Sequence, residues 1–194
     1  MKGLIVTADD FGVAVEVNEA VEQAHTNGIL TAASLMVGGG ALADAVERAR
    51  RLPTLRVGLH IVLVEGRPVL PAADIPDLVG ADGLFRHDMV ASAVNMFFRP
   101  SVRRQLASEI TAQFEAYRAT GLPLDHVNTH KHFHLHPTIA SYILKIGKVF
   151  GLKAMRVPLE PRDILLKADG RVKVAPAYVT GPWAAMVRLS LIHI

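Results

Sequence analysis

Short apolar runs alternate with amphipathic segments along most of this chain, and this alternation constrains the fold more than any other feature of the sequence. Runs that are apolar throughout are typical of strands covered on both faces, and strands that alternate with helices predict a parallel sheet. The sequence therefore predicts an α/β fold whose sheet is either open and doubly wound or closed into a barrel. The strand-like runs are residues 3–6, 29–37, 56–63, 124–128 and 153–157.

Helical spacing fills most of the chain between these runs. The segment from Ala14 to Asn27 ends at an Asn-Gly pair, which favours a left-handed helix stop. Residues 64–86 are rich in Pro, Gly and Asp, which predicts a long surface excursion of the kind that often carries function. The other helical patterns are residues 41–52, a pattern from about His87 that is interrupted at Pro100, residues 101–120 and residues 137–150.

The composition is that of one globular domain. Of the 194 residues, 51% are hydrophobic and 20% are charged, which is enough for a substantial core. Because the chain has no cysteine, a metal site would have to use histidine and carboxylate ligands. The formal net charge of +3 comes without a dense Lys/Arg run, which argues against nucleic acid as a partner.

The sequence contains no segment that predicts a membrane span. The longest uncharged stretch, from Thr26 to Ala43, is broken by three consecutive glycines. The first strand begins almost at once and leaves no room for a signal peptide. We therefore expect a cytoplasmic protein, and the high hydrophobic content leaves open peripheral contact with a membrane surface. A homo-oligomer is also left open.

Unusual polar residues stand where the predicted strands end. Asp9 and Asp10 follow the first run, His60 lies late in the third, and a histidine cluster follows the fourth. In both parallel architectures, functional groups gather at the carboxyl ends of the strands. Consecutive side chains on a strand point to opposite faces, so the two aspartates can share a site only if the strand breaks into a loop. Gly12 would permit that break.

The histidine cluster has a regular spacing. Five of the nine histidines occupy even positions from His126 to His136, and an extended segment would place them all on one side. We expect one of them to be a metal ligand and others to line a substrate cleft. The simpler interpretations are a solvated histidine-rich loop for the cluster and a hydrogen-bonded core residue for His60.

One carboxylate and two histidines at strand ends would hold a metal ion and leave coordination positions open for water. An open site of this kind is typical of catalysis. The ion would polarise a carbonyl and lower the pKa of its bound water, and the second carboxylate would take the proton. The combination indicates metal-assisted hydrolysis.

Three motifs in order resemble those of the YdjC-like carbohydrate deacetylases. They are Thr7-Ala8-Asp9-Asp10-Phe11-Gly12, Gly58-Leu59-His60 and Thr129-His130-Lys131-His132-Phe133-His134. The resemblance runs from Lys2 to about Pro161 and implies a TIM-like (β/α) barrel of the glycoside hydrolase/deacetylase type. It also implies one divalent metal ion, Mg²⁺ or Zn²⁺, and an N-acetylated sugar as substrate.

The resemblance also assigns roles to individual residues. Asp9 would be the general base, and the metal ligands would be Asp10, His60 and His130. His132 and His134 would lie in the substrate cleft, and Arg156 would face the substrate. The segment from Arg156 to Pro161 is similar to the hopanoid-biosynthesis-associated branch of the family, which implies a hopanoid glycolipid as substrate.

The family's chains are longer than this one, and a later histidine motif near their carboxyl end has no counterpart here. Five strands are predicted up to Val157, and residues 158–194 have room for about one more strand and one helix, whereas a closed barrel needs about eight strands. We therefore expect residues 1–194 to form a single catalytic domain that is an incomplete barrel.

Two other functions fit the same residues. The first is a metal-dependent hydrolase or isomerase acting on another polar substrate. The second is a non-catalytic module that binds a metal or a sugar, in which the acids only hold the ion. Asp9 separates the binding module from an enzyme, because a binding module has no need of a second, non-ligating carboxylate.

Overall fold

A computed structural model of the chain describes residues 4–158 and residue 167. Its centre is a sheet of four parallel strands in the order β1-β2-β3-β4, which confirms the predicted mixed α/β fold. The strands are β1 (Thr7–Phe11), β2 (Ala32–Leu35), β3 (Arg56–Ile61) and β4 (Val127–Thr129).

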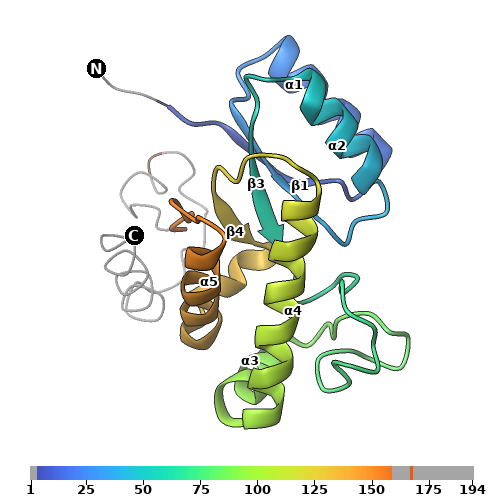
Figure 1. Cartoon of the computed structure of the whole chain (residues 1–194), viewed down its shortest axis with the longest axis vertical. Helices are drawn as coiled ribbons and strands as arrows, with labels where there is room; N and C mark the ends of the chain where they lie inside the picture. Colours follow the sequence, from blue (N-terminus) through green and yellow to red (C-terminus); the bar gives the residue numbers. More distant parts are fainter. Residues whose placement is uncertain (1–3, 159–166, 168–194) are drawn as a thin grey trace.

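The helices lie around this sheet in two groups (Figure 1). Helix α1 packs against α2, and α4 packs against α5 and α3. The helices are α1 (Val15–Thr26), α2 (Leu42–Arg51), α3 (Met89–Phe98), α4 (Pro100–Ala119) and α5 (Pro137–Val149), and a 3-10 segment η1 (His130–Leu135) follows β4. Within residues 4–158 and at residue 167, no helix is long and apolar enough to cross a membrane.

The first strand lies later in the chain than the sequence predicts. The apolar run at residues 3–6 precedes β1, and the two aspartates are part of the strand itself. The strand is interrupted where its pairing with β2 shifts between Ala8 and Phe11. At this point Asp10 has a φ of 61°, in the left-handed region that aspartate tolerates better than most residues. The backbone therefore turns at Asp10 as well as at Gly12, which follows the end of the strand at Phe11 and has a φ of 99°.

The fifth predicted strand is reduced to a single bridge within the described residues. Met155 pairs in parallel with Val127 of β4, and the amide of Arg156 donates to the Val127 carbonyl at 3.0 Å. This contact places Arg156 beside the end of β4. The rest of the predicted carboxyl-terminal continuation falls on residues 159–166 and 168–194, outside the described part.

The strand register places four polar side chains on one face of the sheet. His60 of β3 pairs with Asn128 of β4, and Ser34 of β2 pairs with Gly58, two residues before His60. Since side chains alternate along a strand, residues two apart share a face. Asp9 follows Ala8, which pairs with Ala33, so Asp9 lies level with Ser34.

Helix α4 anchors the excursion that follows β3. The fully buried Glu109 accepts hydrogen bonds from the amides of Val69 and Leu70, at 2.9 and 3.0 Å. One turn later, Gln113 bonds both the amide and the carbonyl of Val62. These contacts satisfy backbone groups that have no strand partner, and they fix the chain just beyond His60.

Candidate metal centre and its neighbouring carboxylate

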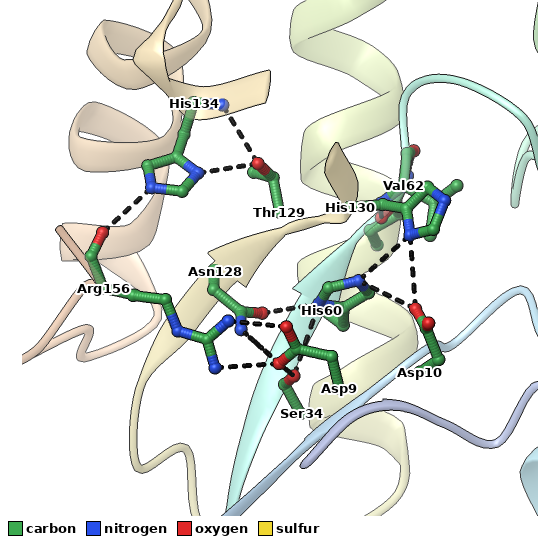
Figure 2. Close-up of polar contacts among 11 residues, drawn as sticks. Asp9, Asp10, Ser34, His60, Val62, Asn128, Thr129, His130, His134 and Arg156 are labelled. Atoms are coloured by element: carbon green, nitrogen blue, oxygen red, sulfur yellow. Dashed lines mark hydrogen bonds and ion pairs between the residues drawn. The ribbon is translucent and has the colours of Figure 1, made fainter. Parts of the chain in front are cut away.

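Asp10, His60 and His130 come together at the carboxyl ends of β1, β3 and β4 (Figure 2). One ligand atom from each lies within 4.8 Å of the other two. Asp10 Oδ1 lies 3.1 Å from His60 Nε2 and 3.2 Å from His130 Nδ1. His60 is 2% exposed and Asp10 is 41% exposed, so the group is rooted in the core and open to solvent on one side.

The two imidazoles hold the pKa of Asp10 well below its usual range, mainly through the hydrogen bonds of His130 and then His60. Asp10 is therefore ionised at neutral pH. Its carboxylate oxygen faces two imidazole nitrogens. Atoms of this kind lie so close together only when a proton or a metal cation is between them. Two imidazoles and a carboxylate form a donor set that fits a divalent transition metal.

Asp9 lies beside this group but has different partners. Arg156 donates to both of its oxygens, Nη1 to Oδ2 at 2.6 Å and Nη2 to Oδ1 at 2.8 Å. The Ser34 hydroxyl and the Asn128 amide also donate to Oδ1, at 2.8 and 2.9 Å. Burial alone would raise the pKa of Asp9, but the Arg156 and Ser34 hydrogen bonds outweigh burial and lower it to about 2.

His134 is fully buried behind Arg156. Its Nε2 lies 2.9 Å from the Arg156 carbonyl, which only accepts, so this nitrogen carries the proton. Its Nδ1 then accepts from the Thr129 hydroxyl at 2.7 Å, and the His134 amide donates back to Thr129 Oγ1 at 3.0 Å. Both ring nitrogens of His134 therefore have protein partners, and the residue supports the backbone that carries Arg156.

The burial of His134 predicts a pH-dependent stability. Desolvation is the main cause that lowers the pKa of His134 from 6.5 to about 4. The unfolded state then binds the proton more readily, so the stabilisation is complete above about pH 6.5 and is lost as the pH falls towards 4. We expect a loss on the order of 3 kcal/mol over this window. Urea unfolding of the chain and of His134→Gln should show a flatter pH dependence for the variant.

The matched control for this prediction is His132→Gln, because His132 is exposed. That variant should keep the pH dependence of the unmodified chain. Equal slopes for the chain and for His134→Gln between pH 6.5 and 4 would contradict the buried, neutral state of His134.

The histidine cluster does not form the one-sided extended row that its spacing predicts. The chain turns into η1 directly after β4, and Lys131 and His132 have φ values of 55° and 54°. As a result His130 joins Asp10, His132 points to solvent and His134 is buried. His136 packs against Phe97 of α3, with ring centroids 5.9 Å apart.

His126, the first of the series, lies below the site. A Cβ atom on Gly58 would come within 2.6 Å of the His126 ring, so the glycine makes room for this imidazole. The His126 Nδ1 atom lies 3.1 Å from Asp125 Oδ2. This histidine therefore fills space beneath the Asp9 network and lies apart from the Asp10 group.

Left-handed backbone is concentrated at this end of the sheet. Among the described residues, four non-glycine positions have a positive φ, and Asp10, Lys131 and His132 belong to the motifs that follow β1 and β4. The fourth, Glu65, follows β3 and forms an ion pair with Lys131, in which Oε2 lies 2.6 Å from Nζ. Such conformations cost free energy and cluster at functional sites in proteins.

Three site residues were not singled out from the sequence as functional: Ser34, Asn128 and Thr129. Ser34 is a lone hydroxyl in an apolar run, and Asn128 and Thr129 resemble turn residues. The alternation of side chains along a strand could have identified Ser34 and Asn128. Once His60 is placed on a strand, parallel pairing puts polar residues of neighbouring strands on the same face at about the same height.

The fold and these side chains define a class: a parallel α/β protein with a candidate metal centre at the carboxyl ends of its strands. The chain belongs to the YdjC-like protein family, which matches residues 3–190. It is 39% identical over 158 residues to a carbohydrate deacetylase of Brevibacillus brevis and 34% identical over 160 residues to a carbohydrate deacetylase of Oceanobacillus iheyensis.

The chain spans only part of these relatives. The first match covers 80% of the chain and 58% of the Brevibacillus protein, and the second covers 82% of the chain and 65% of the Oceanobacillus protein. A similar solved structure is that of an Enterococcus faecalis protein described as a cellobiose-phosphate cleavage protein. It shares 26% sequence identity with a TM-score of 0.68, over 83% of this chain and 62% of that one.

Proposed function

We propose that this chain belongs to a metal-dependent carbohydrate deacetylase that hydrolyses the acetamide of an N-acetylated sugar. The observation that carries the proposal is the separation of the two adjacent carboxylates. Asp10 faces His60 and His130, whereas Asp9 faces Arg156, Ser34 and Asn128. The relatives named carbohydrate deacetylases support the reaction and the sugar.

The residues that would hold the cation are Asp10, His60 and His130. When bound, a divalent cation supplies a Lewis acid that polarises a carbonyl and acidifies water. Imidazole ligands suit Zn²⁺ better than Mg²⁺, which prefers oxygen, so this donor set favours Zn²⁺ of the two expected ions.

The proposed role of Asp9 is to accept the proton of the attacking water. With a pKa of about 2 it is ionised at neutral pH, so it can accept a proton without first losing one. The same low pKa makes it a weak base. General base catalysis is more effective when the pKa of the base is close to that of the group that gives up the proton. Asp9 would therefore act on water whose pKa a bound cation lowers.

The proposed roles of the surrounding side chains follow from their exposure. Arg156 is 26% exposed, and while it orients Asp9 its guanidinium edge remains within reach of a sugar. His132 is exposed beside the group and is our candidate for a direct substrate contact. His134 was expected in the cleft, but its buried ring is better suited to supporting Arg156 than to touching the substrate. The general acid for the leaving amine is not assigned.

The wider proposals concern the fold and the substrate. Four parallel strands in consecutive order suit a TIM-like barrel better than a doubly wound sheet, in which the order reverses at a switch point. The segment from Arg156 to Pro161 is similar to the hopanoid-associated branch of the family. This similarity supports a glycolipid substrate, which would require peripheral contact with a membrane. A single catalytic domain over residues 1–194 and a homo-oligomer also remain proposals.

Metal removal tests the proposed chemistry. We expect a chelator to abolish acetate release from N-acetylglucosaminyl oligosaccharides, and Zn²⁺ added back should restore it, because binding requires only ligands that are already assembled. Acetate and free amine should appear in equal amounts. Undiminished acetate release by the metal-free chain would overturn the mechanism.

A further inference from the structure

Asn128 lies between the two halves of the proposed site. Its side chain is fully buried, and it reaches the carboxylate of Asp9 on one side and the imidazole of His60 on the other (Figure 2). The amide nitrogen lies 2.9 Å from Asp9 Oδ1, and the amide oxygen lies 2.6 Å from His60 Nδ1. Asn128 and His60 are also register partners on β4 and β3.

The charge of Asp9 sets the orientation of this amide. An ionised carboxylate only accepts hydrogen bonds, so the NH₂ group of Asn128 must face Asp9. A flipped amide would bring two oxygens with no proton between them to 2.9 Å inside the protein, which costs more than a lost hydrogen bond. Arg156 and Ser34 keep Asp9 ionised, so the preference for this orientation persists at neutral pH.

The orientation of the amide then sets the tautomer of His60. The carbonyl oxygen of Asn128 only accepts, so His60 Nδ1 must carry the ring proton. The other ring nitrogen, Nε2, lies 3.1 Å from Asp10 Oδ1 and 3.5 Å from His130 Nδ1. Because the ionised Asp10 oxygen also only accepts, Nε2 has a free lone pair only when a metal cation lies between these atoms. Partners of a metal-binding histidine commonly fix its tautomer in this way.

We propose that Asn128 is a positioning residue that relays the orientation imposed by Asp9 to His60, so that His60 presents an unprotonated Nε2 to a divalent cation. The relay rests on the proposed function only for the identity of the cation site. Ser34 cannot replace it, because its hydroxyl donates to Asp9 and its oxygen lies 3.3 Å from His60 Nδ1, a much weaker contact than that of Asn128.

The direct test is side-chain nitrogen-15 NMR of the Zn²⁺-loaded full chain, at a pH well above the ordinary histidine pKa of about 6.5. We expect His60 to bind the ion through Nε2 and to carry its proton on Nδ1. In Asn128→Leu, which removes both hydrogen bonds at similar size, the Nδ1 proton loses its acceptor, and calorimetric Zn²⁺ affinity should fall by about 10- to 100-fold. Ser34→Ala keeps the hydrogen bonds of Asn128 to Asp9 and His60 and should leave Zn²⁺ affinity unchanged.

Asn128→Asp is the conservative variant of the relay. Two carboxyl groups this close inside the protein cannot both ionise, so residue 128 shares a proton with Asp9 while its other oxygen still accepts from His60. We therefore expect the Nδ1–H form and Zn²⁺ binding close to that of the unmodified chain. An Nε2–H form of His60 in the unmodified protein would overturn the inference even if a variant failed to fold. None of these readouts needs a substrate, so a chain with the expected tautomer and no deacetylase activity would refute the proposed function alone.

Discussion

Asp9→Asn should lower deacetylation by about 10²- to 10⁴-fold, the usual contribution of a placed general base, while Zn²⁺ binding is retained. The substitution keeps the size of the side chain and an oxygen that can accept from Ser34 and Asn128, and it loses the hydrogen bond that Oδ2 accepts from Arg156. It removes the negative charge that would take the proton. Because Asp9 is not among the three converging ligand atoms, the cation should remain. Turnover under saturating substrate and Zn²⁺ calorimetry measure the two effects separately.

Asp74→Asn is the matched control for this experiment. Asp74 is an exposed carboxylate in the excursion after β3, and its loss should leave both turnover and Zn²⁺ affinity unchanged. If Asp9→Asn lost metal and activity in equal measure, Asp9 would be a ligand and the division of roles between the two aspartates would be wrong.

Replacing any one of Asp10, His60 and His130 by alanine should have the largest effect on metal binding. Each contributes one of three converging donor atoms, and an ion held by two protein ligands is bound mainly by water. We expect Zn²⁺ affinity to fall by more than about 100-fold, beyond the range typical of residues that only support a ligand. Calorimetry and metal content after dialysis measure this loss.

His25→Ala is a suitable control for the histidine variants. His25 lies on α1 and bonds the Leu30 carbonyl and the Thr54 hydroxyl, away from the strand ends. It should bind Zn²⁺ as the unmodified chain does. A fully occupied site in His60→Ala would show that His60 is not a ligand.

Much of the fold was predictable because it depends on local patterns. The apolar runs and helical spacings located β2, β3 and the helices α1 to α5 of the described residues to within a few residues, since these elements bury their apolar sides in the usual way. The rule that functional groups gather at the carboxyl ends of parallel strands predicted that the aspartates, His60 and the histidine cluster meet. The family resemblance then selected Asp10, His60 and His130, whose ligand atoms do converge.

The parts that the sequence analysis missed depend on particular backbone conformations and on long-range pairing. The positive φ of Asp10 decides that it turns towards His60, and no periodicity reports such an angle. The left-handed Lys131 and His132 disperse the histidines that regular spacing placed on one side. Ser34 and Asn128 became visible only through the register of β2, β3 and β4.

Product analysis in water enriched in oxygen-18 tests the central proposal most directly. The Zn²⁺-loaded chain would be incubated with an N-acetylglucosaminyl disaccharide, and acetate and sugar would be followed by mass spectrometry. We expect one heavy oxygen in the released acetate, none in the sugar, and a sugar lighter by one acetyl group with its glycosidic bond intact. Label in the sugar, cleavage of the glycosidic bond, or binding of the sugar with no product would contradict a deacetylase.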